Sequence, residues 1–123
     1  MEARQAFNKL KAGTTKLATY ANSNKRGSDE FEAIKTVLNV HELTAVSIAE
    51  GVLDERVYRS WFDTTMTSDY EATSAFITRA RKTYDTPRGW CEFEGLAKRW
   101  TDTPREETWW TRKSKALRHL KSA

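Results

Sequence analysis

The residues of this chain best suited to chemistry are its single cysteine and the acids beside it. Cys91 stands between Trp90 and Glu92 in WCEFEGLAKRW, a stretch that ends at Trp100. A reactive thiol needs a cation, a helix N-terminus or a histidine to stabilise its thiolate. The neighbouring carboxylates have the opposite effect. The sequence therefore favours a structural role for this cysteine, and we expect no catalytic residue here.

A second motif, HELTA (residues 41–45), begins like the H-E-x-x-H motif of zinc proteases. That motif needs a second histidine four residues after the first, so that both rings reach one zinc ion from the same helix face. Ala45 stands at that position, so we expect neither a metal ion nor another cofactor. His41 lies in an apolar stripe of helical spacing, which indicates a buried histidine with a hydrogen-bond partner.

Glu42 lies at the margin of the same stripe and must be paired if it is buried. We expect a buried polar pair between Glu42 and Arg81 of the next long helix, with Arg79 as the other candidate partner. The alternative is a polar pocket that also includes Asn39. A single carboxylate without a second acid at a set separation does not specify acid–base chemistry.

The elements that must position these residues are helical. Apolar residues recur at steps of three and four nearly throughout, and the chain has only two prolines and five glycines. We therefore expect an all-α fold, a compact single-domain bundle of five to six helices. A basic helical lead-in (residues 1–26, with a break at 12–15) precedes a helical core (28–101) and a basic amphipathic C-terminal helix (103–123).

Within the core, local signals predict the helix boundaries. Ser28 and Asp54 are expected to cap two helices at their N-termini, and Gly51 to end the first of them. Residues 64–71 are poor in helix formers and match a capping box, so the second helix is expected to kink or restart there. Pro87 is expected to open the next helix, which runs to about Trp100.

The helix that contains WCEFEGLAKRW is expected to be central. Its apolar residues, among them Phe93 and Trp100, share one face. Cys91 and Gly95 are small residues one turn apart, off that face, which favours close approach by a second helix. Enlarging Gly95 to Leu is then expected to overpack that contact.

Charge is segregated along a chain whose net charge is +4. Residues 1–26 carry a net +5, residues 27–102 a net −5, and residues 103–123 a net +4. Either the basic ends fold onto the acidic middle, or they form a basic surface for an anionic partner. A single cysteine makes no internal disulfide, and no apolar run approaches the roughly 18 residues of a membrane-spanning helix. We therefore expect a cytoplasmic protein that does not bind membranes.

A candidate interaction surface combines the basic face of the C-terminal helix with lysines of the lead-in. We expect its contacts to be made with a protein partner; a second copy of the chain is another partner that the Trp-rich helices allow. Nucleic-acid phosphates are the alternative ligand, because Lys and Arg at helical spacing neutralise them. The residues of this surface are Arg112, Lys115, Arg118, His119, Lys9 and Lys16.

Residues 34–101 resemble the short helical proteins of bacteria and their phages grouped as domain of unknown function 4760. The resemblance is carried by LNVHELTAVSIAEGVLDERVYRSWF (residues 38–62), by SAFITRAR (74–81) and by WCEFEGLAKRW (90–100). It implies an all-α fold and supplies no catalytic residues, since the family has no assigned activity. Members often have a membrane helix ahead of the domain, where this chain has its basic lead-in.

We therefore expect a small non-enzymatic protein-interaction module. If it is encoded by a phage or prophage, it would inhibit a host defence complex by steric or charge occlusion. The alternative is a non-specific nucleic-acid-binding protein that uses the basic C-terminal helix and the basic N-terminus.

Overall fold

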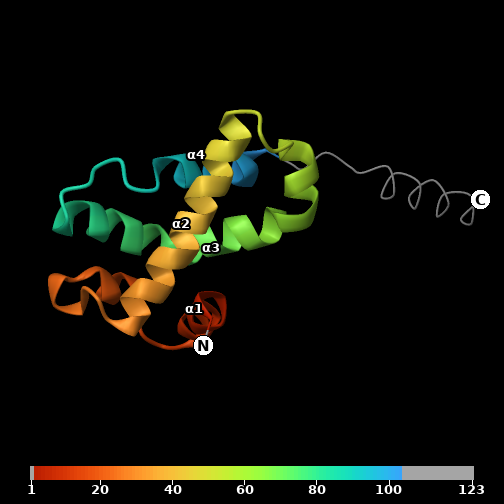
Figure 1. Cartoon of the computed structure of the whole chain (residues 1–123). Helices are drawn as coiled ribbons and strands as arrows, with labels where there is room; N and C mark the ends of the chain where they lie inside the picture. Colours follow the sequence, from red (N-terminus) through yellow and green to blue (C-terminus); the bar gives the residue numbers. More distant parts are fainter. Residues whose placement is uncertain (1, 104–123) are drawn as a thin grey trace, which may run out of the picture.

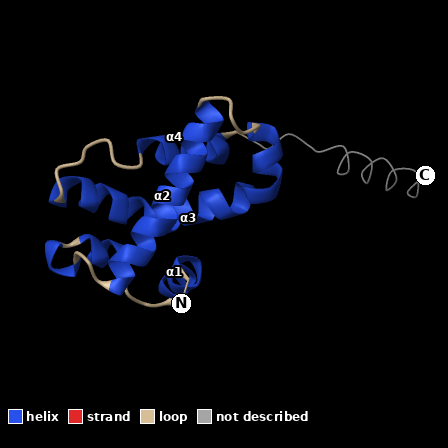
Figure 2. Cartoon of the chain, viewed as in Figure 1, coloured by secondary structure: helices blue, strands red, loops and turns tan. Residues whose placement is uncertain are grey.

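The computed structural model describes residues 2–103, and every regular element in this range is helical (Figures 1 and 2). This confirms the all-α prediction. The elements are α1 (Ala3–Ala12), the 3-10 helices η1 (Leu17–Ala21) and η2 (Ser23–Lys25), α2 (Asp29–Ala49), α3 (Glu55–Thr83) and α4 (Cys91–Asp102). Four α-helices with two 3-10 turns are fewer than the five to six helices expected. The predicted C-terminal helix lies outside the described residues.

The two long helices begin where the sequence predicts. Ser28 Oγ accepts a hydrogen bond from the Phe31 N–H, and Asp54 Oδ1 accepts one from the Val57 N–H, each at 3.2 Å. These side chains satisfy backbone donors that a first helical turn leaves unpaired. Gly51 follows the end of α2 with a φ of +76°, a left-handed conformation that glycine adopts without strain.

Of the two expectations for residues 64–71, the restart is wrong, because α3 runs without a break from Glu55 to Thr83. The hydroxyl of Thr67 donates to the backbone carbonyls of Asp63 and Thr64, so the threonine-rich stretch satisfies its polar side chains within the helix. Such back-bonding commonly accompanies helix bending, and the first turns of α3 run at an angle to the rest in Figure 1.

Helix α4 begins four residues later than expected, after Trp90 rather than at Pro87. Trp90 adopts a left-handed conformation with a φ of +57°, which no helix continues through. No side chain of the preceding turn caps α4. Its first backbone donors are instead accepted by Glu42 of α2, which is fifty residues away in the sequence.

Side chains of α2 and α3 meet in the core, as at Phe31 and Phe76, whose ring centroids lie 6.0 Å apart. Helix α4 packs against both helices (Figure 1). Helix α1 packs against α2, and η1 packs against α3, so the basic N-terminal segment is part of the folded unit. The largest fully buried side chains come from all four α-helices. They are Phe7, Ile34, Leu38, Met66, Asp69, Thr73, Phe76, Ile77 and Phe93.

Candidate interaction surfaces

A fully buried carboxylate joins α1, α2 and α3. Asp69 of α3 accepts hydrogen bonds from Arg4 at 2.5 Å and from Lys11 at 2.8 Å, and its Oδ2 lies 2.8 Å from His41 Nε2. Burial alone would raise the pKa of Asp69, but the hydrogen bonds from His41, Arg4 and Lys11 hold it well below its usual range. Arg4 and Lys11 also cover the ring of Phe7. These interactions hold α1 against α2 and α3.

This cluster confirms that His41 is a buried histidine with a hydrogen-bond partner. It also shows that two cations of the basic N-terminus, Arg4 and Lys11, fold onto the acidic middle of the chain. Among the described residues no group of three His, Cys, Asp or Glu side chains is placed to hold a metal ion. In this cluster, cationic side chains neutralise the buried charge of Asp69.

Sequence reasoning missed Asp69. It lies three residues after the buried Met66 and four before the buried Thr73, so its register places it inside the core stripe of α3. The stretch Ser68–Glu71 instead suggested a new helix start, where an aspartate is ordinary. The available signal was an acidic residue, Asp69, at a position that helical spacing places among the buried residues of α3.

Glu42 and Arg81 have separate partners in the structure. Glu42 Oε1 accepts from the Phe93 N–H at 2.7 Å, and its Oε2 accepts from the Glu92 N–H at 3.3 Å, so it caps α4 from α2. A carboxylate is favoured there by the positive end of the helix dipole. Arg81 donates to the Gly89 carbonyl at 2.9 Å and to Glu94 at 3.3 Å.

Asn39, the third member of the alternative pocket, accepts from the indole N–H of Trp90 at 2.8 Å. The carboxylate of Glu94 accepts from the hydroxyl of Tyr70 at 2.9 Å as well as from Arg81. Burial and this bond to Glu94 raise the pKa of Tyr70 to about 12. Burial acts to raise the pKa of Glu94, but its bonds with Tyr70 and Arg81 lower it overall. These contacts fasten α4 and the turn before it onto α2 and α3.

The expected close approach at Cys91 and Gly95 is wrong. Gly95 is exposed, and a Cβ atom added to it would meet no atom within 4 Å beyond its own helix and neighbours. Cys91 is half-buried at the first residue of α4. Helix α4 therefore packs through the face of Phe93 and Trp100, and its opposite face is open.

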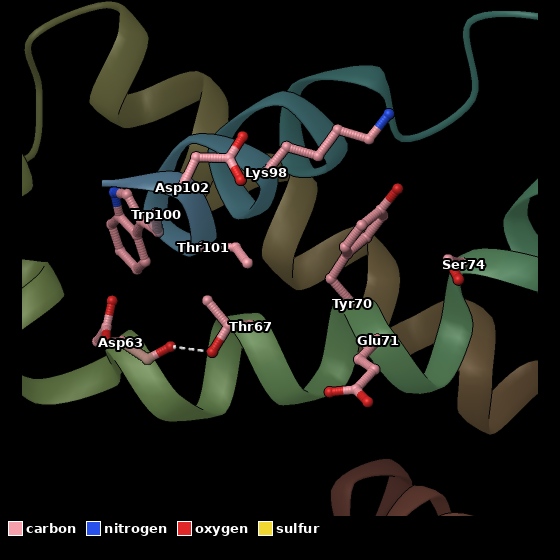
Figure 3. A pocket seen from close by; sticks show the side chains of 9 residues that line it. All are labelled: Asp63, Thr67, Tyr70, Glu71, Ser74, Lys98, Trp100, Thr101 and Asp102. Carbon is pink, nitrogen blue, oxygen red and sulfur yellow. Dashed lines mark hydrogen bonds between the residues drawn. The ribbon is translucent and has the colours of Figure 1, made fainter. Parts of the chain in front are cut away.

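A groove of about 580 Å³ runs between α3 and α4 (Figure 3). Three carboxylates line it, those of Asp63, Glu71 and Asp102, against one cation, Lys98. The indole nitrogen of Trp100 points away from the middle of the groove in Figure 3. The groove is an acidic hollow without a buried polar group directed into it.

The basic residues expected to form an interaction surface are only partly described. Lys9 of α1 and Lys16, just before η1, are both exposed. Arg112, Lys115, Arg118 and His119 lie outside the described residues. The structure therefore shows two of the six members.

The surface that sequence reasoning missed is apolar. Large apolar side chains are exposed over one stretch of chain, residues 40–62, around the turn between α2 and α3. Trp61 is 80% exposed, Val52 76% and Leu43 68%. The turn folds back on α2, since the N–H groups of Val52 and Leu53 both donate to the Ser47 carbonyl. We call this set the corner surface: Val40, Leu43, Val46, Val52, Leu53, Val57, Trp61 and Phe62.

The sequence contained a signal for the corner surface. Val40, Leu43 and Val46 recur at steps of three on α2, but they fall on the side opposite the buried stripe of Leu38, His41 and Ala45. Helix α2 is thus apolar on two sides. An apolar residue opposite a recognised core stripe indicates a second contact face.

Comparison with known proteins places the chain in a family. The model of a domain of unknown function, DUF4760, matches residues 1–100. The chain belongs to this family. The match begins at residue 1, so the basic N-terminal segment lies inside the family's domain and not ahead of it. No match was found among curated proteins or among solved structures. Within the part of the chain that the structure describes, no helix is long and apolar enough to cross a membrane.

Proposed function

We propose that this protein is a non-enzymatic interaction module that binds a protein partner through the corner surface. The observation that carries the proposal is the exposure of Trp61, Val52 and Leu43, whereas the large apolar side chains outside the corner surface are buried or half-buried among the described residues. Exposing large apolar side chains together disfavours the free protein in water, and such patches mark contact sites. Tryptophan in particular is over-represented among the residues that dominate binding energy.

The corner surface differs from the basic surface expected from the sequence. Residues 40–63 contain five acidic and two basic residues, so the apolar side chains lie within an acidic stretch. This charge favours a partner whose contact face is apolar and basic. The module would act by occupying that face, and inhibition of a host complex by a phage- or prophage-encoded protein is one form of such occlusion. We place this action in the cytoplasm.

The proposal is tested by recovering the partner with matched variants. Tagged full-length protein is isolated from cells that encode it, beside a corner variant (Leu43→Ser with Trp61→Ser) and a control variant (Lys9→Ser with Lys16→Ser). All four positions are exposed, so we expect all three proteins to remain folded. We expect one protein to be recovered in stoichiometric amount by the wild type and the control, and lost with the corner variant. Equal recovery by the corner variant would refute the proposal.

Non-specific nucleic-acid binding is the alternative, and it rests on Lys9, Lys16 and the basic residues after Thr103. Arg4 and Lys11 are bound to Asp69, which removes two cations from an open basic surface. Binding to phosphates would weaken steeply as salt rises and would fall in the Lys9→Ser, Lys16→Ser control. Retained binding in that control, with loss in the corner variant, would count against the alternative.

A further inference from the structure

Exposed cations gather at the end of α3 that lies away from the corner surface. Helix α3 has 29 residues, so it is about 40 Å long, and the corner surface lies around its start. Its last turns and η2 lie on the other side of the molecule (Figure 1). We call residues 22–26 together with residues 79–88 the basic end. They contain six Lys or Arg residues and a single acidic one, Asp85.

Side-chain contacts join the two segments of the basic end. Arg79 Nη1 donates to the side-chain carbonyl of Asn22 at 3.3 Å, although 57 residues separate the two in the sequence. The guanidinium of Arg26 covers the ring of Tyr84, 5.3 Å from its centroid. The chain after α3 also folds back on that helix, through a backbone hydrogen bond of 2.9 Å to the Arg81 carbonyl. The basic end is therefore one continuous part of the fold.

Most cations of the basic end have no carboxylate partner. Within the described chain, the Lys and Arg residues that pair with a carboxylate are Arg4, Lys11, Lys35, Arg59, Arg81 and Arg99. Only Arg81 of this set belongs to the basic end. The contacts of Arg26 and Arg79 are to a ring and to a neutral amide, so neither charge is neutralised. The unpaired cations of the basic end, among the described residues, are Lys25, Arg26, Arg79, Lys82 and Arg88.

Nearby charges do not cancel these five cations. The C-terminus of a helix carries about half a negative charge, so the end of α3 balances only a small part of the set. Asp85 adds one negative charge. Asp29 and Glu30 lie in the first turn of α2, where the positive end of that helix dipole offsets part of their charge. The basic end therefore keeps a net positive charge.

We infer that the basic end binds the phosphate backbone of a nucleic acid duplex. Clustered Lys and Arg side chains displace the counterions of phosphates, and these contacts carry no sequence information. Recognition of single strands relies instead on open aromatic rings on which bases stack. Tyr84 is the one aromatic residue of the basic end. Its ring is covered by Arg26 and packs against Phe31, with ring centroids 5.8 Å apart, so it offers no such platform.

This surface is distinct from the corner surface and from the basic residues of the alternative function. A nucleic acid at the basic end leaves the corner surface open. The chain can then hold a protein partner and a nucleic acid at opposite ends of α3. That arrangement suits a partner that itself works on nucleic acid, because both contacts bring the module to the same place.

Fluorescence anisotropy of a labelled DNA duplex of about 20 base pairs measures binding by the full-length protein from about 50 to 200 mM NaCl. Two variants lose two charges each: Lys82→Ser with Arg88→Ser in the basic end, and Lys9→Ser with Lys16→Ser as the control. All four side chains are exposed, so we expect unchanged thermal unfolding by circular dichroism. Each phosphate contact contributes about −0.9 to the slope of log K against log salt. The basic-end variant should weaken binding and reduce that slope by about 2, and the control should retain both.

Asp85→Asn should have the opposite effect. Asp85 has a φ of +51°, and asparagine also adopts this left-handed conformation readily, so the backbone is kept. Removing one negative charge beside the bound phosphates should raise the affinity about twofold at low salt. The same loss of charge in Glu50→Gln, near the corner surface, lies well beyond the screening length and should leave the affinity unchanged.

Four results would overturn the inference. The first is no binding of the duplex at about 50 mM salt, and the second is an unchanged slope in the basic-end variant. Equal reduction of the slope in both double variants would mean that net charge, and not this surface, drives binding. Tighter binding of a single strand of the same length would mean that bases are contacted. The proposed function is judged separately, by the protein partner recovered with the corner variant.

Discussion

Replacement of Asp69 by Asn is the sharpest test of how α1 is attached. The substitution keeps the size of the side chain but removes the buried charge that Arg4, Lys11 and His41 surround. Removing one partner of a buried ion pair typically costs about 3–5 kcal/mol. The side chains of Arg4 and Lys11 are 41% and 23% exposed, so both recover part of their hydration, and we expect a loss of about 3 kcal/mol.

Urea unfolding followed by circular dichroism measures this loss at neutral pH, with Asp63→Asn as the control. Asp63 pairs with Arg59 one turn away on α3, with its side chain 30% exposed, and such pairs contribute at most about 1 kcal/mol. A loss of about 3 kcal/mol should also lower the melting temperature by about 10–15 °C. Combining Asp69→Asn with Lys11→Met should give a coupling energy of the order expected for contacting charges, about 1–3 kcal/mol.

The pH dependence has a defined sign. The pKa of Asp69 is lower in the folded protein than its ordinary value of 3.8, so folding favours the ionised form. The stability contributed by the charge is fully present above the ordinary pKa and is lost as the pH falls toward the folded pKa. The difference between wild type and Asp69→Asn should therefore shrink below about pH 4. A loss no larger than that of Asp63→Asn, or a difference independent of pH, would refute the assigned role.

Three further changes probe the elements around α4. Glu42→Gln weakens the cap on α4 and should lower the free energy of unfolding by about 1–2 kcal/mol, measured in urea against the exposed Glu50→Gln control; equal losses would contradict the cap. Gly95→Ala should raise it by about 0.5–1 kcal/mol, because the added Cβ meets open space and alanine favours the helix, and any loss would mean that this side is packed. An ultraviolet pH titration should find a tyrosine that ionises near pH 12, and Tyr70→Phe should remove it while the Glu94 carboxylate remains; an unchanged titration would contradict the assignment.

Local signals predicted the ends of α2 and the start of α3 because those ends are decided within a few residues. Ser28, Gly51 and Asp54 act on backbone groups of their own turns. The start of α4 was not predictable in this way. Pro87 is a sound local signal, but the helix begins where Glu42 of α2 accepts its first N–H groups, and that contact exists only in the folded chain.

In the candidate site, too, the sequence predicted what is decided locally and missed the contacts made between helices. Periodicity correctly placed His41 inside the fold, but it gave no partner, since Asp69 lies on another helix. Glu42 and Arg81 were expected to pair with each other. In the structure Glu42 accepts from the Phe93 N–H, and Arg81 donates to Glu94. The apolar residues of α2 were assigned to a single stripe, so the exposure of Leu43 went unnoticed. Pairing between helices is a property of their crossing, which spacing along one helix does not determine.

The extent of the family match, residues 1–100, agrees with the contacts that α1 makes in the fold. If residues 1–26 were an independent lead-in, removing them would leave the core intact. Instead Phe7 is fully buried, and Arg4 and Lys11 neutralise a carboxylate at the centre of α3. Without α1, Asp69 would keep only His41 as a partner. The family match from residue 1 therefore agrees with a fold in which α1 is an integral part. Within the described chain, the large apolar side chains that remain exposed are those of residues 40–62, around the turn between α2 and α3.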